Sequence, residues 1–544
     1  MKYNFKQDAK FYFSLYDKYR ADNNLDKAAE YLLEAIKISR SLDLRVELAS
    51  LYSEMGQLDM SNEECYYVLS KDHKNSEIIN ILSANFTEKR NYRAAYYYFS
   101  KMDYYGIEDM PDLIPDTLNR DLNKFGFRLA WSNGVKDCSD IKEEAEIHLA
   151  MKNYKDAIRA LERIYPNSPQ YIWARKMLVF GYYMIEDYER ALEIANDLLE
   201  KAENDISMMT VVYNILTETK QFDKAEKIIE RIKKAECADV GDVLKAGYCL
   251  MSSKKYDDAL ALIKREYSNY PYNDNLMLLM SSAYCLSGNP QKAKDILLRL
   301  INMYGDRTFA KFYLESINRG EFNETGFTYD IPALRAISLN VEIEKNLKSL
   351  DKFGKAFIYD ARFKSIVRWR ILTRSDDDMA FMLINTVGSL NNSASAKFLQ
   401  ELLLKENISG EAKAVIMSYL INAGNRKRIA AVYESYFRIF NMINAKETTP
   451  SFVYAYSLSC IYLSPMLKDY EDDVYTSFIK LNMILNSERT RMKSPEAIAA
   501  LILYNCDNLE ISKEANILAG LFGANAGTLR KYIKILESKY DNLR

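Results

Sequence analysis

Apolar residues in the first 300 positions recur at the three- and four-residue spacing of amphipathic helices, and one short phrase returns with them. In the segment Asn153–Leu161, the small residue Ala157 follows an aromatic residue by three positions and precedes a leucine by four. Related phrases place a small residue at the same point, at Ala28, Ala95, Ala191, Ala225, Ala259 and Ala293. A phrase that recurs at a fixed spacing predicts a repeat architecture of stacked helix pairs.

The register of this phrase predicts eight repeats of about 34 residues each. They cover roughly 9–42, 42–75, 76–109, 138–171, 172–205, 206–239, 240–273 and 274–307. A further segment, from Phe309 to Ile317, predicts a closing helix. Two copies depart from the pattern, since Ser61 replaces the small alanine of the second and Pro290 takes the aromatic place of the eighth. Residues 110–137 break the period and are either an insertion or a degenerate repeat.

Across residues 9–307 the chain resembles tetratricopeptide-repeat proteins of bacterial type. The small residue of each phrase lets the second helix approach the first closely, and small pairs such as Ala246-Gly247 stand where the two helices cross. The resemblance implies an all-α fold, with a right-handed superhelix (an α-solenoid) over residues 1–318. It also implies a protein-binding role.

The remainder of the chain predicts helices without the repeat signature. Residues 319–330 are polar and contain glycines, which is typical of a linker. Helix-length segments with short turns follow within 331–445, and those between about 360 and 445 resemble HEAT-like helical pairs. A C-terminal helical domain is expected over 446–544.

The C-terminal domain carries a pattern that is typical of a helix-turn-helix, at 512–536. Ala519 stands four residues before Gly523, with apolar residues at Leu518, Phe522 and Leu529. With the helix that begins at Ser494-Pro495, the motif resembles the cyclin-box repeat of transcription factor IIB and bacterial tetratricopeptide proteins with such an element. If it reads DNA, its second helix would present Asn525, Thr528, Arg530, Lys531 and Lys534. The poor base-reading content of this helix and Gly527 within it favour instead a structural or protein-binding role.

A binding surface follows from the repeat register, because positions 2, 5, 9 and 12 of the first helix line the groove of a tetratricopeptide superhelix. In the later repeats these positions are Trp173, Lys176, Phe180, Tyr183, Asn214, Leu244, Tyr248, Met251 and Leu278. Aromatic residues and methionines exposed in a groove are typical of peptide capture, and Asn214 is placed to hold a peptide backbone. Two alternatives remain open: these side chains pack on each other, or they pack on the chain's own C-terminal domain.

Composition narrows the possible functions. Basic and acidic residues number 74 and 76, a balance that argues against broad binding to nucleic acid or to a membrane surface and leaves a local basic patch open. The seven cysteines form no CxxC pair and there are only two histidines, so no zinc site can be assembled and free, reduced thiols are expected. The longest uncharged run, 448–467, is interrupted by prolines and serines and is too polar for a membrane span.

No catalytic motif is present, and the carboxylates lie in mixed-charge helical runs. We therefore expect a non-enzymatic, cytoplasmic scaffold that binds a protein or peptide in the repeat groove, without cofactor, metal, membrane or small-molecule substrate. The alternative is a transcriptional regulator that couples groove occupancy to DNA binding by the helix-turn-helix. An enzyme is the third reading, which a polar pocket with converging carboxylates would revive.

Overall fold

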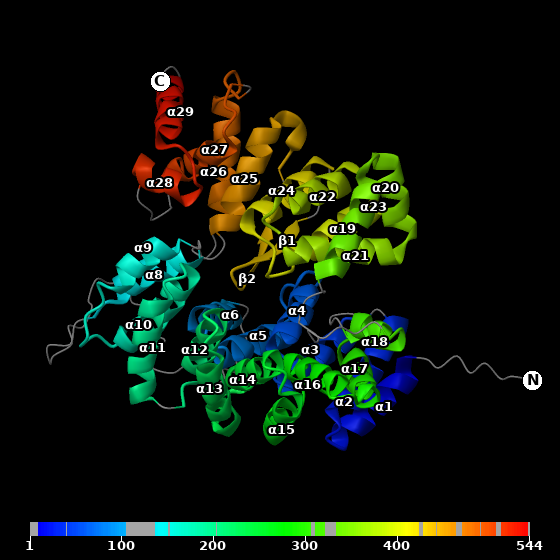
Figure 1. Ribbon diagram of the computed structural model, residues 1–544. Coiled ribbons are helices and arrows are strands. Elements are labelled where there is room, and N and C mark those ends of the chain that lie inside the picture. Colours follow the sequence, from blue (N-terminus) through cyan, green and yellow to red (C-terminus); the bar gives the residue numbers. More distant parts are fainter. Residues whose placement is uncertain are drawn as a thin grey trace, which may run out of the picture. The chain divides into compact units, whose positions relative to one another are not determined.

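The structure is a computed structural model, shown in Figure 1. It describes residues 9–39, 41–104, 137–150, 153–202, 204–305, 310–320, 333–423, 428–441, 443–463, 471–489, 491–506 and 513–541. The predicted linker from 321 onward, the irregular segment up to 136 and residue 512 of the predicted helix-turn-helix lie outside these residues.

The fold is all-α, as the repeat pattern predicts, and it divides into two compact units. Unit 1 comprises Met1–Arg40, Glu54–Gln57 and Asn119–Pro332, and unit 2 comprises Ser41–Ser53, Leu58–Leu118 and Ala333–Arg544. The units follow packing and not chain order, because the second and third repeats group with the C-terminal half. The predicted domain boundaries at 318, 331 and 446 stay a prediction.

Unit 1 is built from helix pairs. Its helices are α1 (Ala9–Ala21), α2 (Leu25–Ile38), α8 (Ser139–Ala150), α9 (Tyr154–Leu161), α10 (Tyr171–Met184), α11 (Tyr188–Lys201), α12 (Ile206–Glu218), α13 (Phe222–Lys234), α14 (Val240–Ser252), α15 (Tyr256–Glu266), α16 (Asp274–Leu286), α17 (Pro290–Tyr304) and α18 (Ala310–Asn318). In each repeat the first helix (A) packs on the second (B), and α8–α17 follow one another as such pairs (Figure 1). The helix expected to close the array is α18.

The turn between the two helices of a repeat has a fixed geometry. A residue with positive φ ends helix A, and it recurs every 34 residues at Glu186, Lys220, Lys254 and Gly288. The residue after it donates its backbone N–H to the last turn of helix A, as Gln221 does to the Leu216 carbonyl oxygen at 2.7 Å. This satisfies carbonyl groups that a helix end leaves without a partner.

The small residues of the repeat phrase lie where the sequence places them. Ala28, Ala95, Ala157, Ala191, Ala225, Ala259 and Ala293 are all buried. The two departures are accommodated: Ser61 Oγ donates to the Ala49 carbonyl oxygen at 2.7 Å, and Pro290 is the first residue of α17. A proline is tolerated there because the first N–H groups of a helix have no partner within it.

Unit 2 contains the second and third repeats, a series of shorter helices and one strand pair. Its elements are α3 (Asp43–Glu54, whose last residue groups with unit 1), α4 (Leu58–Leu69), α5 (Ser76–Glu88), α6 (Tyr92–Tyr104), α19 (Ala333–Leu347), α20 (Leu350–Tyr359), α21 (Ala361–Thr373), α22 (Asp378–Ser389), α23 (Ser393–Leu403), α24 (Gly410–Asn422), β1 (Ile429–Tyr433), β2 (Tyr436–Phe440), a 3₁₀ turn (Ala445–Glu447), α25 (Pro450–Leu463), α26 (Glu471–Ile484), α27 (Pro495–Tyr504), α28 (Ala515–Leu521) and α29 (Ala526–Asp541). Apolar residues on every face of α27 are buried, so this helix is the centre of the C-terminal group.

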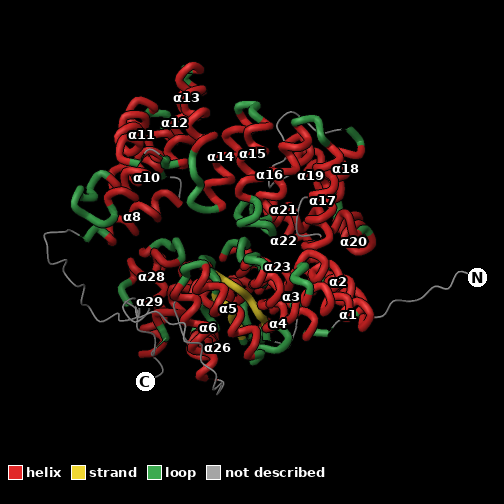
Figure 2. The backbone as a smooth tube through the Cα atoms, turned by 90° about the horizontal axis from the view of Figure 1, so that it is seen from below, coloured by secondary structure: helices red, strands yellow, loops and turns green. Residues whose placement is uncertain are grey.

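The strand pair is an addition to the all-helical region predicted for 331–445. Strands β1 and β2 form an antiparallel hairpin, yellow in Figure 2, with Val432 opposite Phe437. Both turn residues, Glu434 and Ser435, have positive φ, as a two-residue hairpin turn requires. Each strand is only five residues long and rich in aromatic or β-branched residues, a run that periodicity cannot separate from a buried helical segment.

Candidate peptide-binding surface of the repeats

The A helices of the later repeats lie next to one another, since α10 contacts α12, α12 contacts α14 and α14 contacts α16. The residues predicted to line a groove therefore come from neighbouring helices of unit 1. We call the exposed side of α10, α12 and α14 the A-helix face.

On α10 the face combines aromatic residues with a fixed lysine. Phe180 is 39% exposed, and its ring meets that of Tyr154 edge-on with centroids 6.0 Å apart. Lys176 Nζ lies 2.6 Å from Asp205 Oδ2. Trp173 is half-buried against the core, and the ammonium of Lys142 stands over its ring at 5.1 Å. Such stacking leaves only part of the indole for a partner.

Tyr183 joins two repeats at one end of this face. Its hydroxyl donates to Glu218 Oε1 at 2.8 Å, while the hydroxyl of Tyr188 donates to Glu218 Oε2 at 2.5 Å. The two hydrogen bonds hold the pKa of the Glu218 carboxyl below its usual value, and the bond that Tyr188 donates raises the pKa of its own phenol to about 12. Tyr183 is thus a structural link as well as a surface residue.

The middle of the face, on α12, is polar and made of short side chains. Asn214 is half-buried between Thr210 and Thr217. Both threonine hydroxyls donate at 2.8 Å to carbonyl oxygens of their own helix, those of Ile206 and Tyr213. The amide of Asn214 is consequently the polar group of this stretch that is suited to a backbone contact.

On α14 the face becomes apolar again. Tyr248 is 38% exposed, and partial burial raises the pKa of its phenol. Leu244 and Met251 are half-buried and pack against the hydrophobic core of unit 1. Trp173 and Tyr183 also pack partly against this core. The alternative that groove residues only pack within the protein therefore applies to part of each of these four side chains.

One predicted groove residue is wrong: Leu278 is only 3% exposed and belongs to the interior. Helix α16 reads Asp-Asn-Leu-Met-Leu-Leu-Met-Ser-Ser-Ala-Tyr-Cys-Leu, and residues on every side of it are buried. A helix that is apolar all round is enclosed, and the repeat register cannot say which of its positions reaches the surface.

Two residues of the surface were missed. Ile172 and Met184 are exposed on α10 and, with Lys176 and Phe180, they follow one another at four-residue spacing on one side of the helix. The signal was present in that spacing. The prediction considered only positions 2, 5, 9 and 12 of the repeat, whereas Ile172 and Met184 stand at positions 1 and 13.

Within unit 2 the chain docks on its own repeats. Val432 and Phe437 of the hairpin share a core with α4, α5 and α6. Tyr98 Oη donates to the Ser435 carbonyl oxygen at 2.7 Å and accepts from Phe437 N at 2.9 Å. The hydroxyl of Tyr97 donates to the Phe437 carbonyl oxygen at 2.7 Å. Repeat helices of this chain thus hold an extended segment through tyrosine hydroxyls.

The predicted helix-turn-helix corresponds to α28, a turn and α29. Gly523 in the turn has a φ of 63°, and Ala519 and Leu529 are buried between the helices. Asn525 Oδ1 accepts from the Thr528 backbone N–H and so caps the second helix at 3.1 Å, which commits one of the five proposed DNA contacts to structure. The three basic candidates are exposed, and they line one shallow hollow of about 440 Å³ along α29: Arg530, Lys531 and Lys534.

All seven cysteines are free, as expected, and burial raises the pKa of the Cys249 thiol to about 12. No cluster of three metal-ligating side chains occurs among the residues that the structure describes. Within the same residues no helix is both long and apolar enough to cross a bilayer.

Comparison with known proteins gives likenesses of fold alone. No protein-family model matches the chain, and no curated protein matches it. Similar solved structures include a tetratricopeptide repeat protein from Parabacteroides merdae, with 14% identity and a TM-score of 0.23 over 52% of this chain and 99% of that one. Naa15/Naa10 bound to HypK-THB matches at 11% identity and 0.27 over 98% and 80%, and yeast Tom70 at 11% and 0.20 over 91% and 99%. The repeat architecture itself rests on the helix pairs and their 34-residue period.

Proposed function

We propose that this protein is a non-enzymatic scaffold that binds a segment of a partner protein along the A-helix face of α10, α12 and α14. The observation that carries the proposal is the half-exposure of large apolar side chains at Phe180 and Tyr248, with a short polar stretch between them. Aromatic side chains left at a surface are favoured anchors for protein partners because they bury much area at small entropic cost. Methionines are favoured because the flexible thioether adapts to the partner's shape.

The spacing of the helices suggests the form of the ligand. Neighbouring packed helices lie about 8–10 Å apart, so α10 and α14 are separated by roughly 16–20 Å. An extended chain covers that distance in about five or six residues. We therefore expect a segment with two large apolar residues five or six positions apart, whose backbone between them meets Asn214.

The test is capture of partners by cross-linking and mass spectrometry with the wild type and two matched variants. Tyr248→Ala combined with Phe180→Ala removes the two exposed rings of the face and is expected to abolish capture while the fold stays intact. Phe222→Ala removes an exposed aromatic from a B helix and is expected to leave capture unchanged. Unchanged capture by the double variant would overturn the proposal.

A second candidate is the regulator that binds DNA through α29. Exposure of Arg530, Lys531 and Lys534 along one hollow favours it, because these cations stand together on one side of the helix. Phosphate contacts by such side chains would give affinity without much sequence discrimination.

A gel-shift titration on mixed genomic fragments at two salt concentrations tests this candidate. Binding is expected at low salt, to weaken as salt rises, and to be lost in Lys531→Glu with Lys534→Glu. Lys355→Glu, at an exposed lysine of α20, is the control and is expected to bind as the wild type. Absence of any shift at low salt would remove the candidate.

A further inference from the structure

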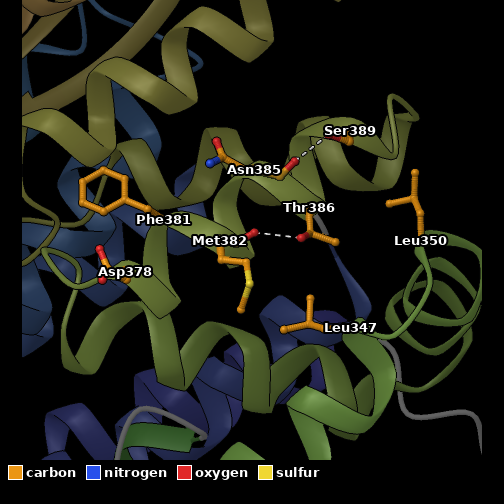
Figure 3. A pocket seen from close by; sticks show the side chains of 8 residues that line it. All are labelled: Leu347, Leu350, Asp378, Phe381, Met382, Asn385, Thr386 and Ser389. Carbon is orange, nitrogen blue, oxygen red and sulfur yellow. Dashed lines mark hydrogen bonds between the residues drawn. The ribbon is translucent and has the colours of Figure 1, made fainter.

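A second open surface lies in unit 2. It is a hollow of about 570 Å³ between α22 and the junction of α19 with α20 (Figure 3). Leu347 and Leu350 line it from the junction, and Met382 points into it from α22. Leu350 is 48% and Met382 42% exposed, so large apolar side chains stand uncovered at its rim.

One whole side of α22 faces this hollow. The residues are Asp378, Phe381, Met382, Asn385, Thr386 and Ser389. Their spacing of three, one, three, one and three positions is the stripe that a helix presents to a packed neighbour. At a rise of about 1.5 Å per residue the stripe is roughly 16 Å long. Three turns of α22 are therefore arranged as one half of a helix–helix contact.

The polar atoms of the stripe leave one charged group for a partner. Thr386 Oγ1 donates to the Met382 carbonyl oxygen at 2.7 Å and Ser389 Oγ to that of Asn385 at 2.8 Å, the two dashed lines in Figure 3. These hydroxyls serve their own helix. Asp378 is the one charged residue among the lining residues, and it is exposed at the start of α22.

We propose that this hollow binds an amphipathic helix of a partner protein, with apolar residues at three- and four-residue spacing toward Met382 and Leu350 and a lysine or arginine toward Asp378. The stripe supplies the shape of a helix–helix seam, and the carboxylate supplies the charge complement. This proposal is independent of the A-helix face, because the two surfaces share no residue.

Fluorescence anisotropy with three synthetic 18-residue peptides tests it. The first carries leucines at positions i, i+4, i+7 and i+11 with a lysine at one end of the stripe; the second has glutamate for that lysine; the third is the first in scrambled order. The wild type is expected to bind the first peptide about twofold to fivefold more tightly than the second, the range of an exposed ion pair. Asp378→Asn is expected to erase that preference, and Met382→Glu to abolish binding.

The matched control is Ile358→Glu, at a residue of α20 that is 46% exposed but does not line the hollow. It is expected to bind the first peptide like the wild type, and circular dichroism checks that each variant is folded. Equal binding of the scrambled peptide, or equal loss in Ile358→Glu, would overturn the proposal. Concentration-dependent dimers that Met382→Glu dissolves would assign the hollow to a second copy of the chain, which also contradicts it.

Discussion

Arg299 Nε lies 2.5 Å from Asp26 Oδ2, although 273 residues separate the two in the chain. Asp26 is in the first turn of α2 and Arg299 is in α17, and these helices pack against each other within unit 1. The first repeat is thus stacked on the eighth. The guanidinium also donates to the hydroxyl of Tyr267, which lies in the turn after α15.

Asp26→Asn is expected to destabilise unit 1. The change removes the carboxylate charge, so the partly buried guanidinium of Arg299 loses its counter-charge and keeps only hydrogen bonds to neutral acceptors. Because both side chains keep about a third of their surface exposed, we expect a loss of only about 1–2 kcal/mol in the free energy of unfolding by urea. Asp351→Asn, at the exposed ion pair with Lys355, is the control. An equal loss of stability in that variant would contradict the prediction that the contact between α2 and α17 stabilises unit 1.

The sequence predicted what repeats and missed what does not. Ala191, Ala225 and Ala259 are buried at equivalent positions because the two helices of every repeat pack in the same way. The sequence pattern that predicts this burial therefore occurs many times along the chain. The pairing of Asp26 with Arg299 occurs once, between repeats at opposite ends of the array. A contact that is made once leaves no periodic signal in the sequence. The repeat phrase therefore does not predict that the first repeat packs against the eighth.

The candidate site was predicted in part for the same reason. Register placed Phe180 and Tyr248 on the A helices and both are exposed, but it could not detect that α16 is enclosed and Leu278 is buried. Exposure depends on what covers a helix, which is a property of the assembled unit. The hairpin at 429–440 was invisible because its ten strand residues carry too few alternations to decide between strand and helix.

Tyr98→Phe is expected to loosen the hairpin. Its hydroxyl serves both the Phe437 N–H and the Ser435 carbonyl, and Tyr98 is buried, so water cannot replace it. Loss of such a bridge costs about 1–3 kcal/mol. Hydrogen exchange is expected to accelerate in 429–440 before other parts of unit 2. Tyr359→Phe removes a hydroxyl from an exposed ring and serves as the control; protection of the hairpin equal to that of the wild type would refute the clamp.

Gly247→Ala is expected to destabilise the array of A helices. A Cβ at this position of α14 would lie 2.6 Å from Leu279 Cδ2, and Leu279 is itself buried in α16. Overpacking of this kind costs about 1–3 kcal/mol. Gly520→Ala in α28 has no atom within 4 Å of the added carbon, so the better helix propensity of alanine is expected to stabilise it by about 0.5–1 kcal/mol. Thermal unfolding compares the two, and a stabilised Gly247→Ala would show that the helices are not in contact there.

The buried amine of Lys413 makes the free energy of unfolding depend on pH. Its side chain is fully buried in unit 2, where the ammonium donates to the Val432 carbonyl oxygen of β1. Burial lowers the pKa of this amine from 10.5 to about 7, against the opposing charge of Glu406. Below pH 7 the folded and unfolded chains both carry the proton, and the cost of burying a charge is present in full. Above pH 7 the folded chain loses the proton first, so the unfolded chain binds more protons and stability rises with pH.

We therefore expect the free energy of unfolding to increase between pH 7 and pH 8, with a slope of at most about 1.4 kcal/mol per pH unit. The window ends at 8 because buried thiols such as Cys249, whose pKa burial raises to about 12, ionise in the unfolded chain as the pH approaches about 9, and stability falls from there. Lys413→Met keeps the volume, removes the charge and is expected to flatten the rise. Lys355→Met, at an exposed lysine, is expected to keep it. Urea titrations at each pH measure the slope, and an identical slope in Lys413→Met and the wild type would mean that another group is responsible.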